Sequence, residues 1–216
     1  MKAVFFDLDG TLTDPFLGIT GCIQHALRNI DGLDVPPASA LAWCIGPPLL
    51  QSLQQLAGTH ADTALGLYRE RFAEIGWREN AVYDGIPELL AQLNDAGVPL
   101  YVATSKPRVY AQRIVDHFGL ARYFQRVFGA ELDGTNADKS DLLATALAAI
   151  DVGCDTTMVG DRSHDIVGAR NNGMRAIGVT YGYGTPEELE TAGAAAVAAS
   201  PAEIAPLLLN LSSSAN

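Results

Sequence analysis

The sequence predicts an α/β fold: a doubly wound parallel sheet with a small helical module inserted after its first strand. Three observations support this. From Tyr83 onward, short apolar runs alternate with segments of helical character, which is typical of β-α-β units. The apolar runs are continuous, as expected of strands covered on both faces. Between the first strand and this alternating part, residues 15–80 show helical periodicity alone.

The first strand is expected at residues 3–6, an apolar run with β-branched and aromatic members that is bounded by Asp9-Gly10. In the insert, apolar residues recur at helical spacing in three groups. These groups span residues 19–30, 49–57 and 64–75, and proline pairs at 36–37 and 47–48 separate the pieces. We therefore expect three or four helices there.

The rest of the chain is expected to alternate between strands and helices. Strands are predicted at residues 100–103, 126–128, 157–159, 176–179 and 196–198. Helices are predicted at residues 86–94, after Pro107, and at residues 141–150, 164–171 and 202–209. The chain then divides into a core domain, residues 1–14 and 81–216, and an inserted helical domain, residues 15–80.

Composition and charge narrow the function classes. With 216 residues, 48% hydrophobic and 18% charged, the chain is typical of a packed globular protein. Its formal net charge of −11 disfavours nucleic-acid polymers and anionic membranes as partners, because both attract lysine and arginine. No apolar stretch has the length of a signal peptide or a membrane-spanning helix. The odd, separated cysteines Cys22, Cys44 and Cys154 are typical of reduced thiols, so we expect a cytoplasmic protein.

Polar side chains follow several of the predicted strands. Residues 7–14 read Asp-Leu-Asp-Gly-Thr-Leu-Thr-Asp, residues 104–107 read Thr-Ser-Lys-Pro, and residues 160–165 read Gly-Asp-Arg-Ser-His-Asp. Lys139, one of only three lysines, stands just before a predicted helix. Because ligands bind at the carboxyl ends of the strands in open parallel sheets, we expect these groups to converge.

The converging groups suit phosphoryl transfer. Asp7 and Asp9 point the same way in an extended segment and, with Asp161 nearby, need a cation between them. An all-oxygen donor set suits Mg²⁺. One carboxylate can attack phosphorus, and a second can protonate the leaving oxygen and later deprotonate water. The phosphoryl oxygens need hydrogen-bond donors, which Thr104, Ser105 and Lys139 can supply. Gly10 has no side chain and lets the backbone approach the phosphate closely.

These motifs resemble those of the haloacid dehalogenase superfamily, and the resemblance extends over nearly the whole chain. It implies that Asp7 is the nucleophile and Asp9 the acid/base. It implies phosphate binding by Thr104 and Lys139. The implied Mg²⁺ ligands are Asp7, Asp161 and the main-chain carbonyl oxygen of Asp9, and Asp165 is implied to support these ligands.

The insert resembles the small helical cap of one branch of this superfamily, and the short gap between Thr104 and Lys139 leaves no room for a second, large cap. A dehalogenase is expected to lack the second aspartate, so Asp9 favours a phosphate ester. Residues 45–49, 160–169 and 179–184 look most like phosphoglycolate phosphatases and a related group of bacterial 5′-nucleotidases. The motifs do not separate these two groups.

We therefore expect a Mg²⁺-dependent phosphatase for a small phosphorylated metabolite, most like a phosphoglycolate phosphatase, with 5′-nucleotidase as the alternative. A sugar phosphomutase shares the cap and the catalytic set but must shield its phosphoenzyme from water. A signalling receiver domain would be about half this length, and a non-catalytic protein would show degraded motifs. Arg162 is expected to pair with a neighbour. His164 is expected either to orient Asp161 or Asp165, or to face solvent or pack locally at a helix N-terminus. A monomer or homodimer is expected.

Overall fold

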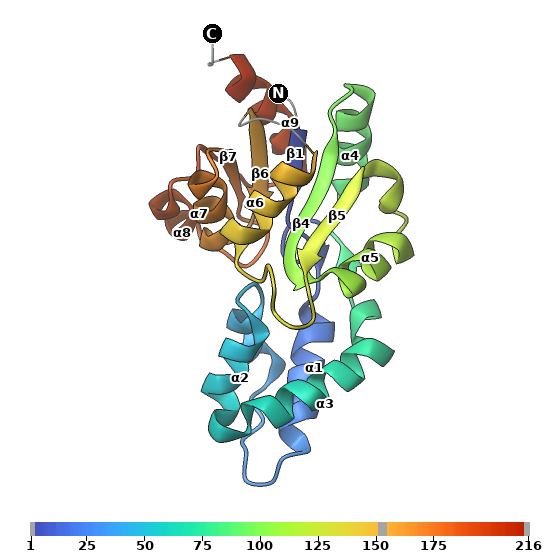
Figure 1. Cartoon of the computed structure of the whole chain (residues 1–216), viewed down its shortest axis with the longest axis vertical. Helices are drawn as coiled ribbons and strands as arrows, with labels where there is room; N and C mark the ends of the chain where they lie inside the picture. The colour runs from blue at the N-terminus through green and yellow to red at the C-terminus, as the bar shows by residue number, and fades with distance from the viewer. Residues whose placement is uncertain (1–2, 151–154, 214–216) are drawn as a thin grey trace. The chain divides into compact units, whose positions relative to one another are not determined.

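The computed structural model describes residues 3–150 and 155–213, with side chains described as far as residue 208 (Figure 1). Contacts divide the chain into two compact units. One contains the chain up to Thr13 and again from Val82 onward, and the other is Asp14–Ala81. The chain passes between the units at β2 (Thr13–Asp14) and β3 (Ala81–Val82), which pair as a two-stranded sheet.

Six parallel strands form the sheet of the first unit, in the order β5-β4-β1-β6-β7-β8. They are β1 (Ala3–Phe6), β4 (Leu100–Pro107), β5 (Arg126–Ala130), β6 (Thr156–Gly160), β7 (Arg175–Val179) and β8 (Ala196–Ala198). From β1 the chain builds outward first through β4 and β5, and then on the other side through β6, β7 and β8. This is the doubly wound sheet that the sequence predicts, and its switch point lies at β1.

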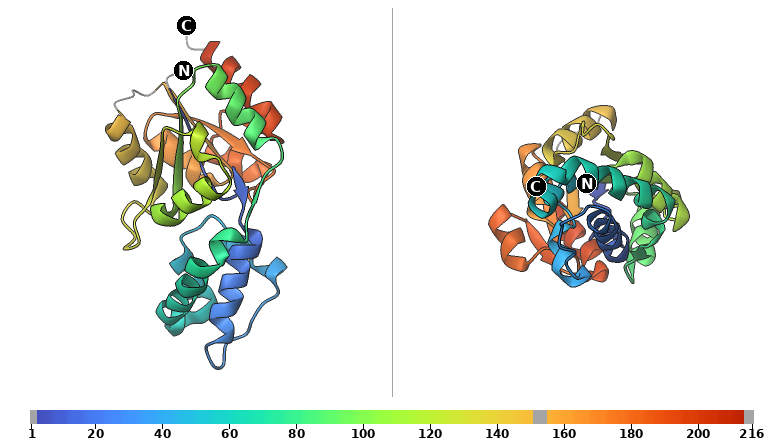
Figure 2. Two further views of the ribbon diagram at one scale, coloured as in Figure 1. Left: turned by 90° about the vertical axis from the view of Figure 1, so that its right-hand side faces the viewer. Right: turned by 90° about the horizontal axis from the view of Figure 1, so that it is seen from below.

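Helices cover both faces of the sheet (Figure 2). The helix α4 (Ile86–Asp95) packs with α9 (Pro201–Ser213), and α6 (Lys139–Ile150) packs with α7 (Ser163–Asn171). In the left-hand view of Figure 2, the gold α6 lies on the face of the sheet opposite the green α4 and the red α9. Coverage on both faces explains why the strands are continuous apolar runs.

Phe5 belongs to a buried core cluster that also contains residues of α6 and α7. All four residues of β1 are fully buried. The Phe5 ring stacks on Tyr101 of β4, with centroids 5.1 Å apart, and lies 6.4 Å from the ring of Phe128 on β5. The aromatic contacts therefore join three neighbouring strands, and they fix the strand whose end carries the first acidic motif.

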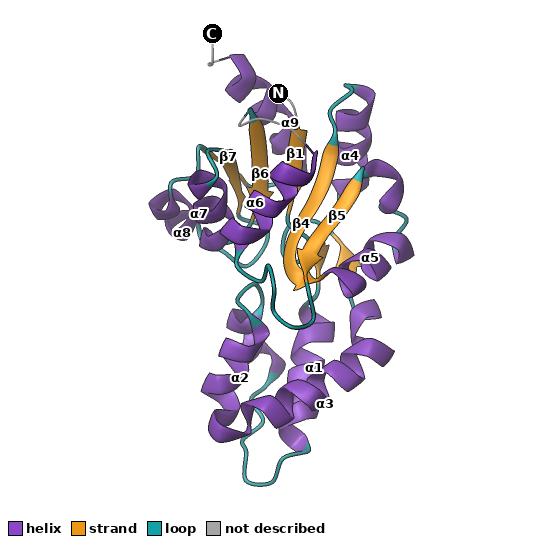
Figure 3. Cartoon of the chain, in the orientation of Figure 1, coloured by secondary structure: helices purple, strands orange, loops and turns teal. Residues whose placement is uncertain are grey.

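The second unit is helical apart from its short strand residues (Figure 3). It contains α1 (Phe16–Arg28), α2 (Leu49–Ala57) and α3 (Ala61–Glu74), together with three 3₁₀ segments, Ala38–Cys44, Gly58–His60 and Gly76–Arg78. The α-helix α1 packs on α3 and α3 on α2. Arg71 of α3 forms two hydrogen bonds with the carboxylate of Glu79, at 2.7 and 2.9 Å.

Two further predictions can be compared with the described residues. Cys22 and Cys44 are buried free thiols, whereas Cys154 lies outside the described residues. None of the described helices is long and apolar enough to cross a bilayer.

The element boundaries differ from the predictions at functionally important places. The strand β4 runs on through Thr104 to Pro107, and α6 begins at Lys139 rather than at residue 141. The helix α8 (Pro186–Ala192) was not predicted, because its few apolar residues show no clear period. Local signals do define it: the Thr185 hydroxyl accepts the Glu188 N–H at 3.1 Å, and Gly193 ends the helix in the left-handed region.

Replacing Phe5 by alanine should lower the free energy of unfolding by about 3–5 kcal/mol, because a buried aromatic side chain is lost from three strands. Urea unfolding of the two proteins measures this difference. Val109→Ala is the matched control, since Val109 is 49% exposed and should change stability by less than about 0.5 kcal/mol. Equal effects of the two substitutions would contradict the central position of Phe5.

Candidate active site

The sequence motifs meet at the carboxyl ends of β1, β4 and β6. Asp7 directly follows β1, and its N–H donates to the Val159 carbonyl oxygen of β6 at 2.9 Å. Asp161 directly follows β6, and Thr104 lies in the last half of β4. Lys139 is the first residue of α6. All four side chains are buried, so the fold places charged groups where water cannot solvate them freely.

Lys139 lies between two carboxylates. Its Nζ is 3.0 Å from Asp7 Oδ1 and 2.7 Å from Asp165 Oδ1, and it donates to the Ala103 carbonyl oxygen at 2.9 Å. The Lys139 side chain is 1% exposed and that of Asp165 is fully buried. One ammonium therefore compensates two buried acids that would otherwise repel each other.

In this arrangement the pKa values of Asp7 and Asp165 shift in opposite directions. Burial raises the pKa of Asp7 to about 6, against the opposing effect of the Lys139 ammonium. Burial would also raise the pKa of Asp165, but Lys139 holds it below its usual value. Burial alone would lower the pKa of Lys139, yet Asp165 and Asp7 raise it above the usual range, so Lys139 stays charged.

Asp9 is paired with Lys106, a residue that sequence reasoning left out of the site. Lys106 Nζ lies 2.5 Å from Asp9 Oδ2. The main-chain N–H of Lys106 donates to the hydroxyl oxygen of Thr104 at 3.2 Å, which places Thr104 beside this pair. Ser105, between them in the chain, is half-buried. The signal was present, because Lys106 belongs to the Thr-Ser-Lys-Pro motif itself.

Asp161 is held by the loop that follows β7. Its carboxylate accepts the Tyr183 N–H at 2.8 Å and faces the Thr11 hydroxyl at 3.4 Å. Two glycines pack against it: a Cβ on Gly10, whose φ is +83°, would lie 2.2 Å from Asp161 Oδ2, and one on Gly182 would lie 2.6 Å from Asp161 Cβ. Gly10 therefore lies against Asp161, and any side chain there would displace a site carboxylate.

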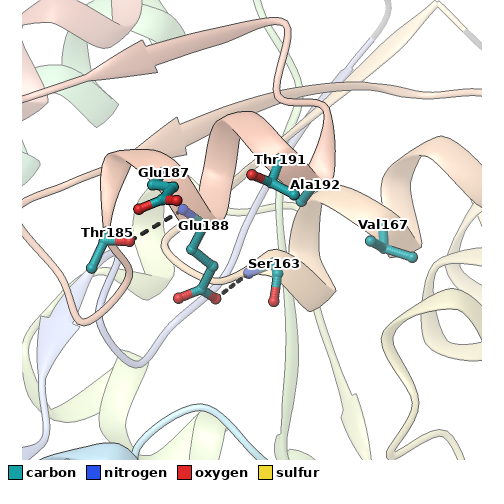
Figure 4. A pocket seen from close by; sticks show the side chains of 7 residues that line it. All are labelled: Ser163, Val167, Thr185, Glu187, Glu188, Thr191 and Ala192. Carbon is teal, nitrogen blue, oxygen red and sulfur yellow. Dashed lines mark hydrogen bonds between the residues drawn. The ribbon is translucent and has the colours of Figure 1, made fainter.

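The segment that carries Asp165 is anchored by α8. The Glu188 carboxylate of α8 accepts the Ser163 N–H at 2.7 Å and the Arg162 Nε–H at 3.1 Å. Figure 4 shows Glu188 reaching from α8 to Ser163 across a surface pocket lined by both helices. Asp165 accepts the Arg162 N–H at 3.1 Å, which closes the first turn of α7. Arg162 thus has the neighbour-pairing contact expected for it.

His164 contributes to the same acidic cluster. Potential ligand atoms of Asp7, His164 and Asp165 lie within 4.8 Å of one another. Burial lowers the pKa of His164, which favours the neutral ring. Burial, together with Asp165 and Asp7, raises the pKa of Asp161 well above its usual value. The protein therefore concentrates buried negative charge here, which a bound cation would relieve.

The donor atoms fit a hard divalent cation. Asp9 Oδ1 is buried and has no hydrogen-bond partner among the residues that the structure describes. Most of the clustered side chains at this site are carboxylates, which are preferred ligands of Mg²⁺ and Ca²⁺. Asp7 and Asp165 both contact Lys139 through Oδ1, so this contact does not distinguish them as direct ligands.

Comparison with known proteins shows which family this chain matches. Residues 4–179 match the family described as haloacid dehalogenase-like hydrolase. A 5′-nucleotidase of Pseudomonas aeruginosa is 48% identical over 190 residues, which cover 86% of each chain. The tyrosine-protein kinase PtkA of Mycobacterium tuberculosis is 42% identical, over 88% of this chain but 65% of the kinase.

A further relative and a solved structure are also similar to this chain. A phosphoglycolate phosphatase of Caulobacter vibrioides is 32% identical, over 88% of this chain and 84% of that protein. The crystal structure of a predicted phosphatase from Clostridium acetobutylicum superimposes with a TM-score of 0.92 at 41% identity, over 97% of this chain and 98% of the other.

Replacing Lys139 by methionine should lower the free energy of unfolding by about 3–5 kcal/mol in metal-free protein, because two buried carboxylates lose their shared cation. Urea unfolding in EDTA measures the loss. Arg108→Met is the matched control, since the Arg108–Glu131 pair is more than half exposed and contributes at most about 1 kcal/mol. A Lys139→Met loss no larger than the control's would contradict the bridging role.

Glu188→Gln should destabilise the protein by about 1 kcal/mol at neutral pH, because charged hydrogen bonds to Ser163 and Arg162 are weakened. Hydrogen bonds to Ser163 and Arg162 outweigh burial and lower the pKa of Glu188 in the folded protein. The unfolded chain therefore binds this proton first, and the contribution is lost as the pH falls below about 4.5. Melting temperatures of the two proteins should converge at acid pH; a pH-independent difference would contradict the carboxylate's role.

Proposed function

This chain belongs to the haloacid dehalogenase-like hydrolase family, and on that premise we propose that it is a Mg²⁺-dependent phosphatase of nucleoside 5′-monophosphates. The observation that carries the chemistry is the buried cluster in which Lys139 bridges Asp7 and Asp165. The nucleotide preference rests on the 48% identity to a 5′-nucleotidase, against 32% for a phosphoglycolate phosphatase. The comparisons thus support the sequence-based alternative better than the phosphoglycolate reading.

In the first proposed step, a carboxylate oxygen of Asp7 attacks phosphorus and the bond from phosphorus to the ester oxygen breaks. Asp9 gives a proton to the leaving alkoxide, so the nucleoside departs as an alcohol. The phosphoryl group is then held as a mixed anhydride on Asp7. Lys139 and the Thr104 hydroxyl are proposed to bind its oxygens, with Ser105 and the backbone at Gly10 alongside.

In the second proposed step, Asp9 removes a proton from water as the water oxygen attacks phosphorus. The bond between phosphorus and Asp7 breaks, which releases inorganic phosphate and returns Asp7 as a carboxylate. A Mg²⁺ ion held by Asp7, Asp161 and the Asp9 carbonyl, with Asp165 behind them, would neutralise phosphoryl charge. Residues 15–80 are proposed to act as the cap that selects the leaving group and excludes water.

The proposal is tested with a panel of phosphate esters. Adenosine, cytidine and uridine 5′-monophosphates are compared with phosphoglycolate and glucose phosphates, in Mg²⁺ and in EDTA. We expect kcat/KM to be at least about tenfold higher for a nucleoside monophosphate than for phosphoglycolate. Phosphate release should stop in EDTA and return with Mg²⁺.

Asp7→Asn is the matched variant for this panel, because it keeps the size of the side chain and removes the nucleophile. It should lower kcat by about 10⁴-fold or more while the unfolding transition is retained. A preference for phosphoglycolate would overturn the nucleotide assignment. Transfer of phosphate from ATP to a tyrosine side chain, without release from any ester, would instead favour the chemistry in the name of the PtkA relative.

A further inference from the structure

The contact between Lys106 and Asp9 is a largely buried ion pair. The Lys106 side chain is 7% exposed and that of Asp9 is 12% exposed. A pair at this depth loses solvation on both partners, unlike a pair of surface side chains. The two residues are far apart in the sequence: Lys106 lies in β4, and Asp9 lies in the loop after β1, the strand that pairs with β4. The contact therefore ties two strand ends together at the candidate site.

The end of β4 is shaped to bring this lysine to Asp9. The pairing of β4 with β5 shifts register between Thr104 and Pro107. Within this irregular segment, the Lys106 N–H donates to the Thr104 hydroxyl oxygen at 3.2 Å instead of continuing a regular ladder. The backbone that carries the ammonium is thus fixed locally, by a side chain that belongs to the candidate site itself.

The ion pair distinguishes the two oxygens of Asp9. Oδ2 is bound by the Lys106 ammonium, whereas Oδ1 is buried and lacks a hydrogen-bond partner among the described residues. Resting on the proposed function, we infer that Lys106 is a positioning residue: it holds Asp9 by Oδ2 so that Oδ1 is the atom that exchanges protons with the ester oxygen and with water. Without Lys106, the Asp9 carboxylate rotates, and either of its oxygens can occupy the position from which protons are exchanged.

If Lys106 acts through Asp9, the effect of removing Lys106 depends on the leaving group. A nucleoside leaves as a strongly basic alkoxide, so its departure needs the proton from Asp9. 4-Nitrophenolate is a weakly basic leaving group and needs little protonation. A lysine that acts through Asp9 therefore matters for formation of the phosphoenzyme from a nucleotide, but much less for its formation from 4-nitrophenyl phosphate. A lysine that binds the phosphoryl group matters equally for both substrates.

The experiment measures single-turnover release of the leaving group by the full chain with Mg²⁺. Lys106→Met should slow release of adenosine from adenosine 5′-monophosphate by about 10²-fold in the single turnover, and steady-state assays should show little change in KM. Release of 4-nitrophenol in the same single turnover should stay within about threefold of the native rate. Lys106→Arg, which keeps the positive charge, should lie closer to the native protein. Arg108→Met removes a nearby exposed cation and should behave like the native protein.

A double substitution tests whether Lys106 acts only through Asp9. In an Asp9→Asn background, Lys106→Met should cause little further loss of the single-turnover rate with adenosine 5′-monophosphate. Additive losses, an equal loss with both substrates, or a raised KM at unchanged kcat would overturn the inference. If Lys106→Met does not fold, Lys106→Gln is measured in the same comparison. Failure of the native protein to release phosphate from either ester would instead refute the proposed phosphatase.

Discussion

One buried ammonium group makes the acidic site of this protein possible. Asp7 and Asp165 each lie within 3.0 Å of Lys139, deep in the fold, and each would be costly to bury as an unpaired ion. Because α6 begins at Lys139, the first turn of a core helix delivers the cation to the ends of β1 and β6. The same charge is available to an incoming phosphoryl group, so the interaction that stabilises the free site also suits its proposed substrate.

The parallel sheet brings the other acidic side chains close to this pairing. Each acidic motif directly follows a strand, and the order β4-β1-β6 brings three strand ends side by side. The supporting contacts come from outside the motifs: the Tyr183 N–H holds Asp161, and Glu188 anchors the turn before Asp165. The protein thus positions its acids with main-chain donors and two lysines, Lys139 and Lys106, and leaves Asp9 Oδ1 without a hydrogen-bond partner among the described residues.

The sequence predicted the fold well because its signals are local. The buried strands are short apolar runs between turn residues, and the motifs after β1, β4 and β6 lie in sequence order next to the strands that place them. It missed α8 and the role of Glu188, since a seven-residue helix with little apolar periodicity gives no strong signal. The pairing of Lys106 with Asp9 was also missed, because the register shift in β4 is a tertiary feature. The proposed preference for nucleotides could not be predicted from the motifs, because the choice of substrate depends on residues that contact the leaving group.

The central claim is that Asp7 carries the phosphoryl group during turnover. Its direct test is a rapid acid quench of the native protein with nucleoside 5′-monophosphate, followed by protease digestion and mass spectrometry. The account predicts a phosphorylated peptide that contains Asp7, with the modification on that residue and absent from the Asp7→Asn protein. A phosphoryl group on another residue, such as a tyrosine, or no phosphoenzyme while phosphate is released, would contradict it.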